Sequence, residues 1–389
     1  DSDYKIINTT NIAAETTRTV SDVGEYWNNF LYVGDGNTPD AHTGVGFQPD
    51  FTWFKNRSAA DGSLLFDSVR GNSNYIRSDS TIAQGNSDTT HRSFDTDGFT
   101  IGDNAAINTS SENYVVWCAK LGGAPTATNS AGAGATPTAG SVKIDGVNLG
   151  SALAGSIAAL KITANTTLGM SAITYTGTGA NATVAHGLGV APAFIIIKDL
   201  DGAVSWVVGS DSIGWTKYLH LDLTNAEATG SFAWNDTAPT STTISLGTWG
   251  NLNTSGRDYI AYCFAPSEFI SIGSYYANSN ADGTFVPTLS SLGIPLMPIW
   301  SLIKGTVGSA SGWGMFDAVR DPYNVTAQEL RANTITAETT STDNMDLVSG
   351  GIKMRSSGGL NNDTGRDPYV YMVIGTPIID TDGRIIAGR

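Results

Sequence analysis

The sequence of 389 residues contains little cysteine, histidine, proline or charge. Two cysteines are too few for a disulfide framework. The four histidines stand outside any His-Glu-x-x-His motif and no Gly-x-Ser-x-Gly string occurs, so hydrolases of those types are not indicated. With only 15% charged residues, the sequence also lacks the composition of helical bundles and coiled coils. No apolar run approaches the roughly 20 residues that span a bilayer.

Basic residues are scarce relative to acidic ones. The sequence has 21 Lys plus Arg against 36 Asp plus Glu, which gives a net charge of -15. Such a chain repels phosphate backbones and anionic lipid. We therefore expect no nucleic-acid partner and no membrane insertion. The acidic residues are scattered, which is typical of a solvated surface.

Glycine and aromatic residues, by contrast, are abundant. The sequence has 45 Gly, 9 Trp, 14 Tyr and 13 Phe, and 40% of its residues are apolar. This is too much apolar material for a disordered chain. Short apolar runs bounded by Gly, Asn, Asp or Pro predict strands, and turn signals such as Asp97-Gly98 and Asp201-Gly202 separate them.

One order of signals occurs three times along the chain. Each copy has an opening Tyr, a middle strand that ends in Lys, and a closing strand that begins next to a second Tyr. The matching positions are Tyr32, Lys55 and Tyr114 in the first copy, Tyr175, Lys198 and Tyr259 in the second, and Tyr275, Lys304 and Tyr369 in the third. Each copy spans roughly 90 to 100 residues, the size of one compact all-β domain.

The predicted fold class is therefore all-β, with three tandem antiparallel β-sandwich (jelly-roll-like) repeats and an extended arm rich in Gly, Ala, Ser and Thr between the first and the second. The predicted boundaries are 1–30 for a lead-in segment or the end of a truncated upstream region, 31–123 for repeat 1, 124–169 for the arm or linker, 170–266 for repeat 2, 267–377 for repeat 3, and 378–389 for a C-terminal tail.

The arm is far longer than an ordinary connection between domains. It is either a flexible linker or an ordered segment that packs elsewhere. Its part Ser141–Leu149 alternates apolar and polar residues around Asp145-Gly146, which predicts a hairpin that a spacer would not need. We therefore favour an ordered arm that reaches a neighbouring domain or subunit.

The two cysteines, Cys118 and Cys263, occupy the same place in the closing strands of repeats 1 and 2. If each faces the core of its own domain, they cannot pair, and each acts as a small apolar residue. The alternatives, a thiol nucleophile or a metal ligand, have no histidine at ligand spacing to support them. We expect no catalytic residue, no cofactor and no metal.

A repeated acid–base pair gives the first candidate contacts with a ligand or partner. Phe-Asp-Ser-Val-Arg contains Asp67 and Arg70, and Phe-Asp-Ala-Val-Arg contains Asp317 and Arg320, whereas repeat 2 has diverged at this point. An Asp and an Arg three residues apart could orient a sugar or a partner carboxylate. The alternative is that each pair locks its own turn.

Tryptophans of repeat 2 give the second set of candidates. Exposed indoles would form stacking platforms for sugars, and the residues concerned are Trp206, Trp215, Trp234 and Trp249. Burial in the core of a sandwich is the alternative for all four.

Acidic residues leave two further hypotheses open. The strings Asp95–Gly98, Asp199–Gly202 and Asp380–Gly383 begin as calcium loops do, but none has the later bidentate Glu, and hairpin turns explain them without an ion. A glycosidase that uses two carboxylates distant in sequence is the other hypothesis.

Several strings resemble a known family. Tyr-Val-Gly-Asp-Gly, Thr-Gly-Val-Gly-Phe-Gln-Pro-Asp-Phe-Thr-Trp-Phe-Lys-Asn-Arg-Ser, Leu-Phe-Asp-Ser-Val-Arg-Gly and Asn-Tyr-Val-Val-Trp-Cys-Ala-Lys are similar to a repeated β-domain of structural proteins in tailed bacteriophages, particularly marine ones. The resemblance extends from about Leu31 to Ile374 and is weakest in repeat 3. It implies a virion or tail component, and it carries over no catalytic residue.

The sequence thus leads to one main expectation and two alternatives. We expect a non-enzymatic structural protein of a bacteriophage particle, in a tail, fibre or head appendage, located in the virion and acting through homo-oligomeric contacts and contacts with other virion proteins. The first alternative is a carbohydrate-binding adhesin that contacts host-surface glycan, which requires several exposed tryptophans. The second is a polysaccharide depolymerase, which requires two carboxylates in a cleft.

Overall fold

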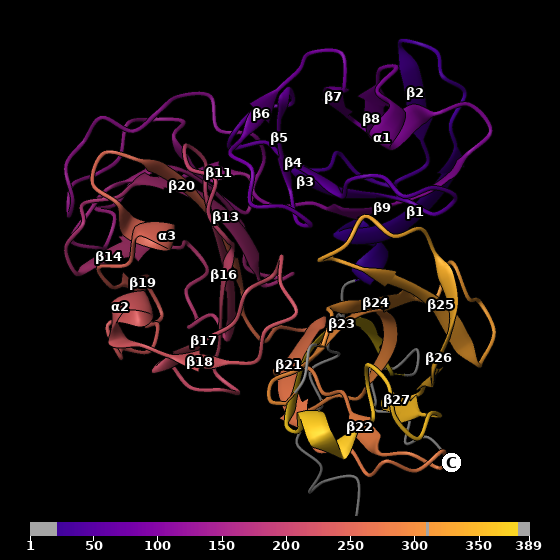
Figure 1. Ribbon diagram of the computed structural model, residues 1–389. Coiled ribbons are helices and arrows are strands. Elements are labelled where there is room, and N and C mark those ends of the chain that lie inside the picture. The colour runs from indigo at the N-terminus through magenta and orange to yellow at the C-terminus, as the bar shows by residue number, and fades with distance from the viewer. Residues whose placement is uncertain (1–21, 309–310, 380–389) are drawn as a thin grey trace, which may run out of the picture.

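The computed structural model describes residues 22–308 and 311–379, and strands make up most of its regular structure. The all-β class is confirmed, and Figure 1 shows the three units as three lobes around a common centre. The lead-in up to residue 21, the tail from residue 380 and the string Asp380–Gly383 lie outside the described residues.

Unit one, shown in indigo and purple in Figure 1, pairs two antiparallel sheets. The first has the order β1 (Trp27–Val33), β9 (Asn113–Ala119), β3 (Phe51–Asn56), β4 (Leu64–Asp67), β5 (Asn74–Arg77) and β6 (Gly85–Asn86). The second has the order β2 (Asp40–Thr43), β8 (Gly98–Ile101) and β7 (His91–Asp95). The short helices are η1 (Val23–Glu25) and α1 (Ala105–Asn108). The apolar side chains between the two sheets form the core of this unit.

Unit two has a seven-stranded sheet and two strand pairs. The sheet has the order β11 (Val147–Asn148), β10 (Val142–Ile144), β12 (Ala159–Asn165), β13 (Met170–Thr176), β20 (Asp258–Phe264), β15 (Phe194–Asp199) and β16 (Val207–Ser210). The pairs are β14 (Ala182–Ala185) with β19 (Thr243–Leu246), and β17 (Lys217–Tyr218) with β18 (Ala228–Thr229). The helices are α2 (Ser231–Trp234) and α3 (Gly250–Asn253).

Unit three is a single eight-stranded sheet that curls around its own core and nearly closes into a barrel. Its order is β21 (Ile270–Tyr275), β28 (Tyr369–Pro377), β23 (Leu296–Gly305), β24 (Gly314–Asp317), β25 (Thr326–Arg331), β26 (Thr339–Val348), β27 (Gly351–Met354) and β22 (Phe285–Pro287). The short helix η2 (Thr364–Arg366) precedes β28.

One strand order recurs in all three units. Each has an opening strand (β1, β13, β21), a closing strand (β9, β20, β28) and a middle strand (β3, β15, β23), hydrogen-bonded side by side in that order, with β4, β16 or β24 next. The register is also the same, because the middle strands pair Phe51 with Asp67, Phe194 with Ser210, and Trp300 with Asp317. These pairs identify equivalent positions in the three units.

The shared strands are buried on both faces. Alternate residues of the closing strands enter one core common to all three units: Val115, Trp117 and Ala119; Ile260, Tyr262 and Phe264; Val370, Met372 and Ile374. The residues between them enter the core of their own unit: Tyr114, Val116 and Cys118; Tyr259, Ala261 and Cys263; Tyr369, Tyr371 and Val373. The expectation that Cys118 and Cys263 face separate cores is confirmed, and both thiols are free.

The two repeated tyrosines of each unit stack on each other. The ring centroids lie 5.1 Å apart for Tyr32 and Tyr114, 5.3 Å for Tyr175 and Tyr259, and 5.0 Å for Tyr275 and Tyr369. The opening Tyr hydroxyl donates to a backbone carbonyl in each unit, at 2.5 to 2.7 Å. These contacts explain why both tyrosines recur.

Beside each tyrosine pair, a buried asparagine holds the loop that follows the opening strand. The carboxamide of Asn253 accepts from the Thr178 amide at 2.7 Å and donates to the carbonyls of Ala180 and Gly247 at 2.7 Å. Asn108 and Asn362 bind the corresponding loops of units one and three. We call these three residues the asparagine clamps.

The unit boundaries differ from the predicted ones in two places. Strand β1 begins at Trp27, before the predicted boundary at residue 31, because the indole of Trp27 belongs to the common core. The predicted arm, 124–169, supplies β10, β11 and β12 to the sheet of unit two. It also contacts unit one, where the amide of Gly122 donates to Thr163 Oγ1 at 2.8 Å. The predicted hairpin is confirmed as the pairing of β10 with β11.

The asparagine clamps predict a specific stability loss. Asn253→Ala leaves the Thr178 amide and the buried Gly247 carbonyl without their side-chain partner, whereas the exposed Ala180 carbonyl keeps the Thr178 hydroxyl. We therefore expect the free energy of unfolding to fall by about 1 to 3 kcal/mol. The control is Asn148→Ala, at an exposed position of β11, where we expect little change. Urea denaturation of both variants measures the difference, and equal stabilities would contradict the clamp role.

Candidate functional site

The repeated Asp–Arg pairs lie at the junctions between units. In unit one, Arg70 Nε donates to Asp67 Oδ2 at 2.7 Å, and the Arg70 amide donates to Asp67 Oδ1 at 2.9 Å. Tyr262, on the closing strand of unit two, donates from its hydroxyl to Asp67 Oδ2 at 2.6 Å. Burial raises the pKa of Tyr262 well above its usual value, so the hydroxyl keeps its proton and remains a donor. The pair locks its own turn and also binds a neighbouring unit.

The equivalent pair of unit three meets unit one. Arg320 Nε donates to Asp317 Oδ2 at 2.6 Å, and Trp117 Nε1 of the closing strand β9 donates to the same oxygen at 3.2 Å. The Arg320 guanidinium also lies 5.8 Å from the centre of the Trp117 ring. Trp117 and Tyr262 occupy equivalent positions. Trp117 pairs with Trp53, two residues after Phe51 in β3, and Tyr262 pairs with Ile196, two residues after Phe194 in β15. The same contact is therefore made twice with different donors.

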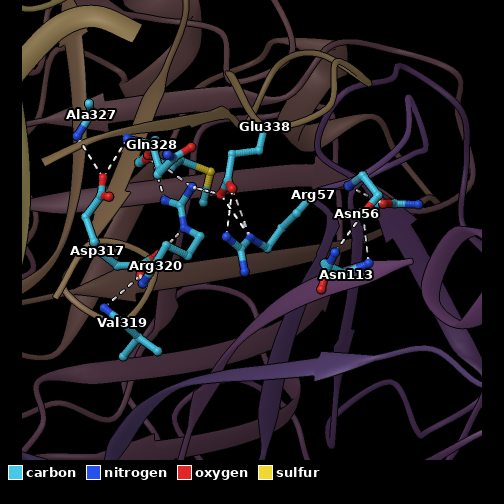
Figure 2. Close-up of polar contacts among 12 residues, drawn as sticks. Asn56, Arg57, Asn113, Asp317, Val319, Arg320, Ala327, Gln328 and Glu338 are labelled. Carbon is cyan, nitrogen blue, oxygen red and sulfur yellow. Dashed lines mark hydrogen bonds and ion pairs between the residues drawn. The ribbon is translucent and has the colours of Figure 1, made fainter. Parts of the chain in front are cut away.

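Glu338 adds a second acid to the junction of units one and three. It accepts from Arg320 Nη1 at 3.0 Å and from Arg57 Nη2 and Nε at 2.7 and 3.0 Å. Figure 2 shows the two guanidinium groups directed at this carboxylate. Two arginines and two carboxylates thus balance in charge, and each ion has at least one charged hydrogen-bond partner, which offsets the cost of burying it.

Unit two has no Asp–Arg pair of its own, because Ser210 stands where the other units have Asp67 and Asp317. In place of such a pair, tryptophan indoles donate hydrogen bonds across the junctions of unit two. Trp313 Nε1 of unit three donates to the His220 carbonyl of unit two at 2.7 Å, and Trp206 Nε1 of unit two donates to the Arg77 carbonyl of unit one at 2.9 Å. Each unit therefore contacts both of the others, and the three form a closed ring.

Of the four tryptophans proposed as stacking platforms, three are buried and one is partly buried. Trp206 and Trp234 are fully buried, Trp215 is 7% exposed, and Trp249 is half-buried against Tyr218 and Phe232. The other five indoles of the chain are buried as well. The platform interpretation is corrected: these side chains fill the core of unit two or its junction with unit one.

Three equivalent lysines at the ends of the middle strands are buried, a placement that the sequence alone did not predict. Lys55 Nζ donates to the Thr334 carbonyl of unit three, and Lys198 Nζ donates to the Thr81 carbonyl of unit one at 3.1 Å. Lys304 Nζ donates to the Ser311 carbonyl. Burial lowers the pKa of Lys55 and Lys198 to about 8 and that of Lys304 to about 7. The recurrence of a lysine at the end of every middle strand is the sequence signal that indicates a shared role for these three residues.

Other candidate chemical groups serve the local structure. Burial lowers the pKa of His91 to about 3 and that of His186 to about 4, and it raises the pKa of both cysteine thiols. In the turn Asp95–Gly98, Asp97 accepts from the amides of Gly44 and Gly46 at 3.0 and 2.7 Å. Within residues 22–308 and 311–379, no group of three or more His, Cys, Asp or Glu is placed to hold a metal ion. In the same residues, no helix has the length and apolarity to cross a membrane.

The junction of units one and three predicts the effect of removing one charge. Asp317→Asn leaves the buried Arg320 without its closest carboxylate, so we expect the free energy of unfolding to fall by about 3 to 5 kcal/mol. Asp282→Asn is the control, because Asp282 forms an exposed ion pair with Lys353 and its loss should change little. Equal effects of the two substitutions in urea denaturation would show that the junction does not stabilise the fold.

The buried lysines predict a pH dependence. The pKa of Lys304 is about 7 in the folded chain and 10.5 when unperturbed, so the unfolded chain binds more protons between these values and stability rises with pH. We expect Lys304→Met to reduce the slope between pH 7 and 8.5 by up to about 1.4 kcal/mol per pH unit. Lys161→Met, which removes a partly exposed amine, should leave the slope unchanged. Urea denaturation at several pH values measures it, and identical slopes in wild type and Lys304→Met would contradict the assignment.

Comparison with known proteins gives one family match. No curated protein and no solved structure matches the chain. Residues 22–148 and 141–376 both match one family, and together these stretches include all three units. The chain belongs to this family, which is described as a domain of unknown function (DUF7483).

Proposed function

We propose that the chain is a non-enzymatic structural component of a bacteriophage particle, in a tail, fibre or head appendage, which acts by assembling with other subunits. The sequence resemblance to repeated domains of phage structural proteins supports the setting. The observation that carries the structural role is the closed ring, in which three equivalent units contact one another through a common core.

The charged groups at the junctions bind other residues of the ring, and this supports a mechanical role. At the junctions, the carboxylates of Asp67, Asp317 and Glu338 bind arginine side chains and neighbouring units. A head-to-tail arrangement that closes after three units is the geometry of a cyclic trimer, here built into one chain. Such a ring resists deformation, since moving one unit breaks contacts with both others.

The two alternative functions have less support. An adhesin that stacks sugars on indoles needs exposed tryptophans, and none of the nine is exposed. A depolymerase needs two carboxylates that are free to transfer protons or attack sugar. Asp50, which lines a cavity of about 450 Å³, accepts from the amides of Leu121 and Gly123 at 2.9 and 3.0 Å and from the Ser68 hydroxyl at 2.8 Å. These contacts give the Asp50 carboxylate a structural task.

Particle association tests the proposal. Particles of a phage that encodes this chain are purified on a density gradient and analysed by quantitative mass spectrometry. We expect the chain to co-sediment with particles at a fixed ratio to the major capsid protein, and deletion of its gene to leave particles that lack one appendage. A chain found in the soluble lysate and absent from washed particles would contradict the proposal, as would release of reducing sugar from host polysaccharide.

A further inference from the structure

Exposed apolar side chains are distributed unevenly over the three units. Of the fifteen large apolar side chains that are exposed in residues 22–308 and 311–379, ten belong to unit three. Six of these ten lie in two segments, the loop from β22 into the start of β23 and the loop between β24 and β25: Leu289, Leu292, Met297, Val319, Tyr323 and Val325. We call these six residues the apolar end of unit three.

Hydrogen bonds hold the two segments at the same end of the unit-three sheet. The Asn324 carboxamide donates to the Leu347 carbonyl and accepts from the Leu347 amide, both at 2.9 Å, just before the turn between β26 and β27. In that turn, Gly350 donates to the Leu296 carbonyl at 3.1 Å and accepts from the Thr288 amide at 2.9 Å. Both segments therefore border one turn, and their exposed side chains belong to one region of the surface.

The equivalent turn of unit one is buried. Val69 follows Asp67 in the sequence as Val319 follows Asp317, but Val69 is 1% exposed and lies in the common core, whereas Val319 is 42% exposed. Farther along the same loop, unit one has Gly-Asn-Ser at 71–73 where unit three has Asp-Pro-Tyr at 321–323. The turn that unit one covers completely at its junction with unit two is thus covered only in part in unit three.

Charge is scarce at the apolar end. Residues 283–303 and 347–351 contain no charged residue. In the β24–β25 loop, Arg320 is buried in its pair with Asp317, and Asp321 accepts from the amides of Ala327 and Gln328 at 2.7 and 2.6 Å. A basic partner would be attracted to the acidic groups that give the chain its net charge of -15. A second copy carries that same charge, and two such chains can approach closely only where charge is scarce, since like charges that face each other are costly.

We propose that the apolar end of unit three is the contact surface between two copies of this chain, which meet through the same residues in a two-fold symmetric dimer. The exposed fractions of its six side chains correspond to on the order of 500 Å², a size typical of functional patches. A standard interface takes about 800 Å² from each partner. Exposed polar neighbours such as Ser291 and Ser349 supply the remaining area as a polar rim around the apolar centre.

Two-fold symmetry places the most prominent side chain of this surface in the contact of both copies. Tyr323 is 84% exposed, and aromatic side chains of this kind are enriched at interfaces. In an isologous dimer, each residue of the surface is used twice, so one substitution changes both halves of the contact. A charge placed at Tyr323 would meet apolar side chains of the other copy without a counter-ion.

Sedimentation velocity of the purified 389-residue chain tests the proposal. We expect a monomer at about 1 μM to become a dimer by about 100 μM, and added NaCl to favour the dimer because it screens the repulsion between two acidic chains. Tyr323→Asp should raise the dissociation constant of the dimer by about tenfold or more. Val147→Asp is the matched control, because it adds the same charge at a side chain of unit two that is 68% exposed, and it should dimerise as wild type does. Thermal unfolding checks that both variants fold.

Three results would overturn the assignment: a monomer at every concentration, a dimer that the two substitutions weaken equally, or a dimer that added salt dissociates. The dimer surface rests on the proposed assembly role, but the two fail separately, because self-association is measured without particles. A monomeric chain that co-sediments with particles would contradict only the dimer, whereas a dimeric chain that is absent from particles would contradict only the virion role.

Discussion

Burial of the closing strands on both faces is the constraint on which the remaining structure depends. One face of β9, β20 and β28 packs within its own unit and the other packs in the common core. A unit isolated from the ring would expose residues such as Trp117, Tyr262 and Met372 to water. Burial of this apolar area strongly favours the assembled ring over separated units.

Polar contacts give this apolar arrangement its specificity. Apolar burial alone is not directional, whereas the hydrogen bonds from Trp117 to Asp317 and from Tyr262 to Asp67 require one relative orientation of the units. At the remaining junction, Trp313 reaches the carbonyl of His220. Trp117 and Tyr262 stand at equivalent positions of their closing strands, whereas Trp313 precedes β24. The three junctions therefore use different side chains, which lets one chain close the ring in a single order.

The sequence predicted the units better than their assembly. Recurring tyrosines, turn signals and the Asp-Gly hairpin at 141–149 depend on local spacing and can be read from one chain. The common core could not be predicted in this way, because a strand buried on both faces is a continuous apolar run without a preferred side. For the same reason the sequence left both a surface position and a core position open for Trp206 and Trp215, with the core the commoner one for a sandwich. The arm was hard to place because small residues give little apolar signal even where they pair as strands.

Native-state hydrogen exchange, measured by NMR or mass spectrometry, tests the common core most directly. The amides of β9, β20 and β28 should exchange only through opening of the whole ring, with one free energy for all three strands. Destabilisation by Asp317→Asn, a change at the junction of units one and three, should lower that value by the same amount in β20 as in β9 and β28. Distinct free energies for the three strands, with β20 unaffected by Asp317→Asn, would contradict a ring held together by one shared core.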